Sequence, residues 1–366
     1  MRVATMVRGW IATPAPPDVV YAPMTVASAV ASGLTARGST VDFYAPRGSR
    51  VPGVPLYDGS LDPVVTDRAG FDRVIARATR GDYADLVAAD RHLARLMARG
   101  AAAGRYDVLL FHHLEVAAAI AGDVPQTPVV SVLWDPPGPE LTAGADEHPN
   151  LFVIAVSDGQ RRDAGDLPII GTVYPGVDCP ADLPPRTRRD GGSRLVYLGR
   201  LIPEKGPDIA VEVATRTGAQ LDLIGPVRSD DRRFFDEKVR PHLSARIRYR
   251  GHVPHNRLAD YLAGASALLM PIRWQEPFGL VMIEAMAHGV PVIGFGRGAV
   301  PEVVAHGVSG YVVNSTDEMC RAVRALDQLS AEGCRRHVRE RFSVHQMVDG
   351  YQAALAKATA LASSRP

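Results

Sequence analysis

The sequence predicts an α/β protein of two consecutive domains, each a parallel sheet with helices on both faces. Strand-like and helix-like segments alternate along the whole chain, which is the pattern of such sheets. The 366 residues exceed what one hydrophobic core ordinarily organises. Proline, glycine and arginine crowd residues 175–193, which is typical of a linker. We therefore expect an N-terminal domain over residues 1–175, a second domain over 176–343 and a terminal helix over 344–366 that crosses back to the first domain.

Apolar runs rich in β-branched residues predict strands, and longer amphipathic runs predict helices. The strands expected in the first half are Val3–Val7, Thr40–Tyr44, Val108–Phe111, Pro128–Leu133, Leu151–Val156 and Ile169–Val173. The helices expected there are Met24–Ala36, Arg68–Ala78, Tyr83–Ala103 and Val116–Ala121. After the linker the alternation restarts with strand Leu195–Leu198, helix Glu204–Thr217 and strand Gln220–Ile224, and it ends with a helix near Val344–Ala362.

Composition narrows the function classes. The formal net charge of +1 lacks the basic excess of a nucleic-acid binder. Cys179, Cys320 and Cys334 fit neither a disulfide framework nor a zinc site, so a reducing cytoplasm is the expected location. Apolar runs are too short for a signal peptide or a transmembrane helix.

The most informative segment surrounds two carboxylates, Glu276 and Glu284. A helix is expected over Gly279–His288, with Glu276 in the loop before it and Glu284 in its second turn. The amides of Phe278, Gly279 and Leu280 are donors at the helix start, which suits a phosphate. A carboxylate among apolar neighbours needs donors such as ribose hydroxyls. Taken alone, the pair also has a purely structural interpretation, in which Glu276 is a solvated loop residue and Glu284 is a paired residue of the core.

The segment resembles the signature of the family 4 glycosyltransferases, which are retaining enzymes of the GT-B fold. That signature is Glu, seven residues and Glu, followed by Ala-x-Ala-x-Gly-x-Pro-Val, and here the second part reads Glu284-Ala-Met-Ala-His-Gly-Val-Pro-Val. The match is close over residues 195–304 and looser before them. The resemblance implies two doubly wound Rossmann-like domains facing across a cleft, with the nucleotide sugar bound by the second. It implies that Glu276 holds the transferred sugar and Glu284 the ribose.

A second motif follows the strand that opens the second domain. Gly199 allows a tight turn, and Arg200 and Lys205 flank that turn. A guanidinium fork and an ammonium suit two adjoining phosphates, although such a pair is also common on solvated loops. In the family the corresponding Gly-Arg-x-x-x-x-Lys-Gly segment holds the donor diphosphate.

Three further residues are assigned through the resemblance. The backbone at Val253, after Gly251, corresponds to the family's contact with the nucleobase. His112, at the end of strand Val108–Phe111, corresponds to a family histidine that contacts the donor sugar, and His113 is the alternative residue. The other interpretation is that the histidine has only a structural role. Gly9 is the second residue of the proline-rich loop Arg8–Pro23 after the first strand. The family has a Gly-Gly pair in this loop near the phosphates or the acceptor, and this chain has none.

The resulting hypothesis is a retaining glycosyltransferase that moves a sugar from a nucleotide-diphosphate sugar to a hydroxyl of a soluble small-molecule acceptor, as in natural-product or sugar-conjugate biosynthesis. Glu276, Arg200, Lys205 and His112 form its catalytic set, and no metal or cofactor is expected beyond the donor. Alternatives are a GT-B nucleotide-sugar epimerase or phosphorylase, a non-catalytic relic of the fold, and a transferase acting on a membrane lipid. The sequence does not identify the sugar, the base, the acceptor or the oligomeric state.

The lipid alternative depends on the helix expected over Tyr83–Ala103. Arg91, Arg95 and Arg99 form one stripe along it, which could face anionic headgroups. Asp82, Asp85 and Asp90 dilute that basic face, so a solvated surface is the favoured interpretation. Membrane association is therefore not expected.

Overall fold

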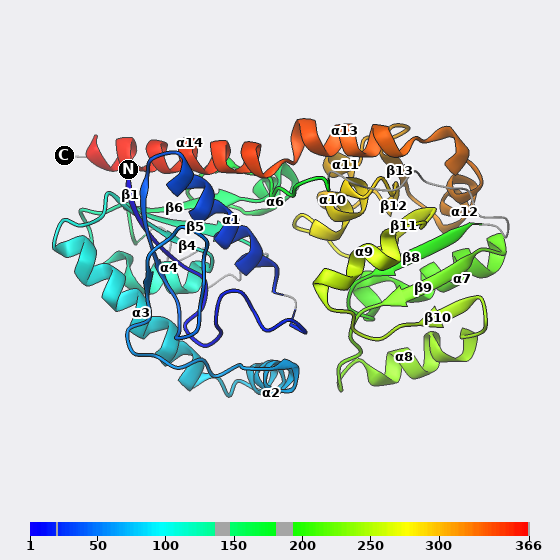
Figure 1. Ribbon diagram of the computed structural model, residues 1–366, viewed down its shortest axis with the longest axis horizontal. Coiled ribbons are helices and arrows are strands. Elements are labelled where there is room, and N and C mark those ends of the chain that lie inside the picture. Colours follow the sequence, from blue (N-terminus) through cyan, green and yellow to red (C-terminus); the bar gives the residue numbers. More distant parts are fainter. Residues whose placement is uncertain (20, 136–146, 181–192, 365–366) are drawn as a thin grey trace. The chain divides into compact units, whose positions relative to one another are not determined.

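The computed structural model describes residues 1–19, 21–135, 147–180 and 193–364 of the chain. It divides into two compact units, Met1–Pro175 with Val344–Pro366, and Gly176–Ser343. Most of the predicted linker, including Pro184-Pro185 and Gly191-Gly192, lies outside the described residues. Each unit is an α/β structure built on a parallel sheet (Figure 1).

The first unit is organised by a seven-stranded parallel sheet in the order β3-β2-β1-β4-β5-β6-β7. Its strands are β1 Arg2–Met6, β2 Thr40–Tyr44, β3 Leu56–Tyr57, β4 Val108–Phe111, β5 Val129–Leu133, β6 Leu151–Ala155 and β7 Ile169–Thr172. The chain moves outward from β1 to β3 and then returns to place β4 on the other side of β1. The β1/β4 boundary is therefore a topological switch point, where ligands of such folds bind at the carboxyl ends of the strands.

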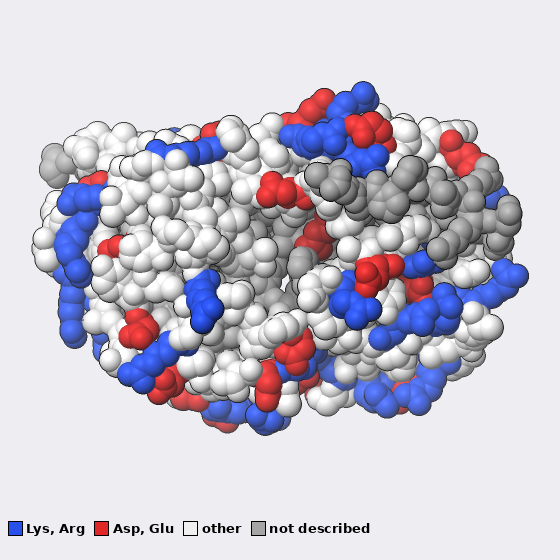
Figure 2. Space-filling view, viewed as in Figure 1, with Lys and Arg blue, Asp and Glu red and all other residues white. Residues whose placement is uncertain are grey.

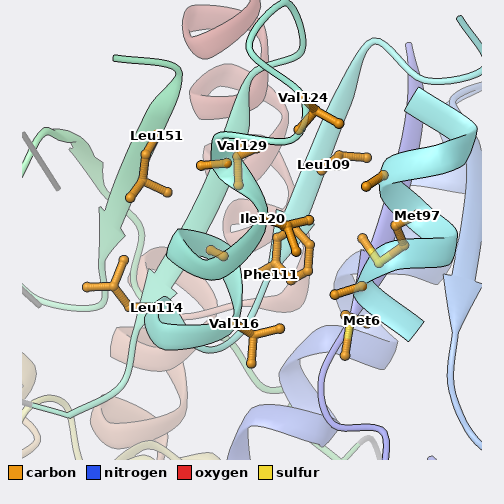
Figure 3. Close-up of a cluster of buried hydrophobic side chains, with 14 of the residues drawn as sticks. Met6, Met97, Leu109, Phe111, Leu114, Val116, Ile120, Val124, Val129 and Leu151 are labelled. Carbon is orange, nitrogen blue, oxygen red and sulfur yellow. The ribbon is translucent and has the colours of Figure 1, made fainter. Parts of the chain in front are cut away.

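Helices cover both faces of this sheet, as the alternation predicts. They are α1 Ala22–Ala36, α2 Arg68–Thr79, α3 Ala84–Ala102, α4 Leu114–Ala121, α6 Asp158–Asp163 and α14 Val344–Ser363. Helices α3 and α4 pack together over β4 and β5, where buried side chains such as Met97, Phe111 and Ile120 form one core cluster (Figure 3). Helix α14 packs on α1, and a Cβ at Gly33 would overlap the side chain of Val348, so the glycine permits that approach.

Helix α3 is amphipathic, and its arginine stripe is exposed. Arg91, Arg95 and Arg99 are exposed, and Lys and Arg side chains gather along the left-hand edge of the first unit, where α3 lies (Figures 1 and 2). The interpretation of Asp90 as part of that polar face is wrong, because Asp90 is only 4% exposed. It follows Leu86 by four residues and therefore lies on the buried stripe.

The second unit has a six-stranded parallel sheet in the order β10-β9-β8-β11-β12-β13. Its strands are β8 Arg194–Leu198, β9 Gln220–Ile224, β10 Ile247–Tyr249, β11 Ala267–Met270, β12 Val292–Phe295 and β13 Gly310–Val313. Its α-helices are α7 Pro207–Thr217, α8 Arg232–Lys238, α9 Leu258–Leu262, α10 Leu280–Ala287, α11 Val300–Val303, α12 Thr316–Arg324 and α13 Ala331–Arg341. Short 3-10 turns are Pro203–Lys205, Arg240–His242, His255–Arg257 and Leu326–Gln328. The switch point of this sheet lies between β8 and β11.

The predicted helix Glu204–Thr217 is wrong at its start, because a 3-10 turn over Pro203–Lys205 precedes α7. Gly206 separates the two with a φ of 69°, in the left-handed region that favours glycine. A Cβ on Gly206 would overlap the carbonyl oxygen of Pro271, in the segment after β11. The break brings Lys205 close to that segment.

Within the described ranges, no helix combines the length and apolar character needed to cross a membrane.

Candidate functional site

Two glycines set the backbone at the carboxyl edge of the second sheet. Gly199 follows β8, and its amide donates to the carbonyl of Ile224 at the end of β9 at 3.0 Å. A Cβ on Gly225 would overlap the carbonyl oxygen of Gly199. The turn predicted at Gly199 therefore lies against the neighbouring strand, and the chain leaves the edge toward Arg200 and Lys205.

The centre of this edge is an ion pair between two residues predicted for the site. Lys205 Nζ donates to Glu276 Oε2 at 2.5 Å, and Glu276 is 7% exposed. Trp274 Nε1 donates to the same oxygen at 2.9 Å, and the ammonium of Lys205 lies 4.3 Å from the centroid of the Trp274 ring. One carboxylate thus fixes both side chains, and the indole face adds a cation–π contact to Lys205. Residues 71 positions apart in sequence form one polar group.

A glycine-rich loop holds the backbone of Glu276 in place. Ala299 N donates to Glu276 O at 2.9 Å, and Gly298 N donates to Gln275 Oε1 at 2.6 Å. Gly298 has a φ of 54°, and a Cβ there would overlap the backbone nitrogen and oxygen of Glu276. Only glycine allows the loop to approach this closely.

Helix α10 begins beside Glu276, one residue later than predicted. Gly279 is its N-cap, with a φ of 80°, and Leu280 is its first residue. Phe278 is buried, whereas Leu280 and the carboxylate-bearing Glu284 in the second turn are half-buried. The positive end of the helix dipole therefore adjoins the Lys205–Glu276 pair.

Two other predicted residues lie at the same edge. Arg200 follows Gly199 and is half-buried, and no hydrogen bond or ion pair of its guanidinium occurs among the described residues. Val253, in the loop after β10, is 7% exposed. The structure thus places every second-unit residue predicted for the donor at the carboxyl ends of β8, β10 and β11. Their contacts with a ligand stay predictions.

In the first unit, His112 follows β4 and is fully buried. Its ring stacks on Trp134 at 6.4 Å between centroids and lies 6.5 Å from Tyr351 of α14. Neither ring nitrogen has a hydrogen-bond partner within the described parts of the chain. Burial lowers the pKa of His112 to about 3, so the ring is neutral near pH 7. Its role toward a donor sugar stays a prediction, for which the two unpartnered nitrogens are a physical motive.

The low pKa of His112 predicts a pH-dependent stability. The folded-state pKa is about 3 and the ordinary value is 6.5, so between these values the unfolded chain binds a proton that the folded protein rejects. Stability is therefore lost as the pH falls. When the pH falls from 7 to 4, the free energy of unfolding of the wild type should decrease by about 3 kcal/mol more than that of His112→Leu. Urea unfolding at several pH values measures this difference, and His242→Leu, at an exposed histidine, is the control. Plots of unfolding free energy against pH that run parallel for the wild type and His112→Leu would contradict the prediction.

Gly9 also has a structural explanation. Its amide donates to Asp90 Oδ1 at 2.6 Å, and a Cβ on Gly9 would overlap the carbonyl oxygen of Ala89. Asp90 accepts as well from Arg8 Nη1 at 2.9 Å. The loop after β1 is thus anchored to α3 by a buried carboxylate. A donor-binding role for Gly9 stays a prediction.

Sequence reasoning missed the structural roles of Trp274, Gly298 and Asp90. Asp90 had a readable signal, because it interrupts the apolar period of α3 at a position that faces the core. The contact of Trp274 with Lys205 and that of Gly298 with Glu276 depend on how separate loops meet, which local sequence does not encode. No group of three His, Cys, Asp or Glu side chains suited to a metal occurs in residues 1–19, 21–135, 147–180 and 193–364.

The sequence of this chain is similar to those of known glycosyltransferases. Residues 192–329 match the family model described as glycosyl transferases group 1. A D-inositol 3-phosphate glycosyltransferase of Streptomyces bingchenggensis is 30% identical over 260 residues, which cover 63% of this chain and 56% of the relative. The chain spans about half the length of the first curated relatives that it matches.

Solved structures decide the fold. A glycosyltransferase involved in avilamycin A biosynthesis superposes with a TM-score of 0.68 at 24% identity and 98% coverage of both chains. The Anabaena protein HepE, solved in complex with UDP, gives 0.68 at 16% identity, covering 98% of this chain and all of that one. The fold is GT-B. The GT-B second unit contains the whole segment that matches the family model, together with the Lys205–Glu276 pair.

Proposed function

We propose that this GT-B protein is a retaining glycosyltransferase that transfers a sugar from a nucleotide-diphosphate sugar to a hydroxyl of a soluble small-molecule acceptor. The observation that carries the proposal is the Lys205–Glu276 ion pair, at a switch point and beside the start of α10. A paired ammonium and carboxylate can separate toward two ligand groups, the diphosphate and the sugar hydroxyls.

The reaction places growing negative charge on the leaving diphosphate. Arg200, Lys205 and the first amides of α10 are the groups that would stabilise it, because positive charges and helix-start amides in a partly buried site favour the negative charge that develops there. In a front-face mechanism the leaving phosphate accepts the proton of the acceptor hydroxyl, and no other base is assigned. Glu276 would hold the sugar and Glu284 the ribose.

The same positive groups support metal-independent transfer, since they can meet the diphosphate without a cation. Chelation with EDTA should leave the transfer rate unchanged. A rate that collapses with EDTA and returns with Mg²⁺ or Mn²⁺ would contradict metal independence.

The second candidate function is a nucleotide-sugar epimerase of the same fold, and the products formed distinguish it from a transferase. Incubation with UDP-, GDP- and ADP-sugars should release nucleoside diphosphate only when an acceptor is present, apart from slow hydrolysis. UDP comes first in the panel because HepE, similar in fold, was solved with it. Conversion of the donor to an epimer without transfer would contradict the proposal.

Glu284→Ala is expected to weaken nucleotide binding by about 1–3 kcal/mol, the range for hydrogen bonds to a charged group. The motive is its half-buried position in the second turn of an otherwise apolar helix. Titration calorimetry with the preferred nucleoside diphosphate measures the loss, and Glu212→Ala on the exposed face of α7 is the control. Equal affinity of Glu284→Ala and wild type would remove the ribose assignment.

A further inference from the structure

The first unit has a second polar group at its own switch point, which the donor site does not use. Arg8 follows β1, His113 follows β4, and Tyr21 immediately precedes α1. Arg8 Nη2 lies 2.8 Å from His113 Nδ1, and the Tyr21 hydroxyl lies 2.9 Å from His113 Nε2. Arg8 Nε also lies 3.3 Å from the Tyr21 hydroxyl.

These contacts fix where the protons are. A guanidinium only donates, so His113 Nδ1 must be an unprotonated acceptor. Burial and the charge of Arg8 lower the pKa of His113 well below its ordinary value, so the ring is neutral. Its single proton is then on Nε2, which donates to the Tyr21 oxygen.

The Tyr21 oxygen thus accepts two hydrogen bonds, from His113 and from Arg8. Its own hydrogen has no acceptor within the described residues. Tyr21 keeps part of its surface exposed. A hydroxyl that is held by two donors and keeps its hydrogen free is prepared to donate to an oxygen atom of a ligand.

The charges around Tyr21 indicate which kind of oxygen. Arg8 pairs with Asp90 at 2.9 Å and with Glu115 at 2.7 Å, so two carboxylates surround one guanidinium. Four of the five N–H hydrogens of the guanidinium are directed at Tyr21, Asp90, His113 and Glu115, which leaves a single Nη1 hydrogen. With His113 neutral, the group carries a net negative charge, which disfavours an anionic ligand.

We propose that Tyr21 binds the acceptor, and that the acceptor presents an uncharged hydroxyl or ring oxygen there. This rests on the proposed function, because it takes the first unit's ligand to be the sugar acceptor. The class of acceptor is a neutral polyol or sugar, in preference to its phosphorylated form. Arg8 and His113 are positioning residues that act through Tyr21.

The binding test uses protein with 13C-labelled tyrosine rings, in which loss of one signal in Tyr21→Phe identifies Tyr21. The probes are myo-inositol, glucose, fructose, inositol 3-phosphate and inorganic phosphate. At least one uncharged polyol should shift the Tyr21 signal saturably, and inorganic phosphate should not. The inference is overturned if no polyol shifts it, or if the phosphorylated probes shift it at lower concentration.

A kinetic test separates binding from a structural effect. With a polyol that reacts, Tyr21→Phe should raise the acceptor KM about 5- to 10-fold, the loss of one neutral hydrogen bond, and leave the donor KM unchanged. Tyr83→Phe, whose side chain is exposed, is the matched control. Equal changes in both KM values would show a merely structural role and overturn the assignment.

Nucleotide binding by the second unit, measured on the same sample, keeps the two proposals distinguishable. Loss of polyol binding with intact nucleotide binding contradicts only the Tyr21 assignment. Absence of nucleotide binding contradicts the proposed function, whatever Tyr21 does.

Discussion

Replacing Lys205 with alanine is expected to lower turnover by about 100-fold or more. The variant removes a positive charge from the position expected for the leaving diphosphate, where charge grows in the transition state. It also leaves the carboxylate of Glu276 without the ammonium 2.5 Å away. Steady-state nucleotide release measures the change, and Lys238→Ala, an exposed lysine at the end of α8, is the control.

The double variant Lys205→Ala/Glu276→Ala tests whether the pair acts as a unit. If it does, the double variant should be little slower than the slower single variant, since coupled residues are not additive. Lys205→Ala at a near wild-type rate would remove the ion pair from the catalytic account.

Gly298→Ala is expected to lower turnover by on the order of 100-fold, because misplacing a reactive group by about 1 Å can cost that much. The added Cβ would overlap the backbone of Glu276 and displace its carboxylate. Gly307→Ala is a matched control, because Gly307 also has a positive φ, 77°, but a Cβ there meets nothing within 4 Å. Backbone strain is therefore common to both variants, and the contact with Glu276 is not.

Turnover should fall in Gly298→Ala alone, and Gly298→Ala should also lose more thermal stability than Gly307→Ala, because only its Cβ overlaps backbone atoms. Similar turnover in the two variants would show that strain, and not the position of Glu276, determines the rate.

Much of the fold could be predicted because local pattern and tertiary burial agree. Strands Thr40–Tyr44, Val108–Phe111 and Gln220–Ile224 have the predicted bounds, since apolar runs of this length lie inside parallel sheets. The two-residue strand β3 Leu56–Tyr57 was not predicted, because a segment this short carries no periodic signal.

Errors arose where a close tertiary approach overrides the local pattern. Glu204–Thr217 has a helical composition, yet the approach to Pro271 imposes a left-handed Gly206 and shortens the helix. Asp90 was assigned to the surface because charged residues are rarely buried, and its partners Arg8 and Gly9 come from a distant loop.

The candidate site shows the same division. Motif spacing indicated Lys205 and Glu276 separately, and the sheet order explains why they meet, since β8 and β11 are neighbours. The free hydrogen of Tyr21 could not be predicted, because it follows from a tautomer that only the contacts with Arg8 and His113 define.

The most direct test of the proposed transfer follows the anomeric configuration by proton NMR. The protein is incubated with an α-linked nucleotide sugar and the polyol panel, and spectra are taken as nucleoside diphosphate is released. We expect one α-linked product for each nucleoside diphosphate released, and loss of both signals in Lys205→Ala but not in Lys238→Ala. A β-linked product, or a donor converted without release of nucleoside diphosphate, would contradict the account.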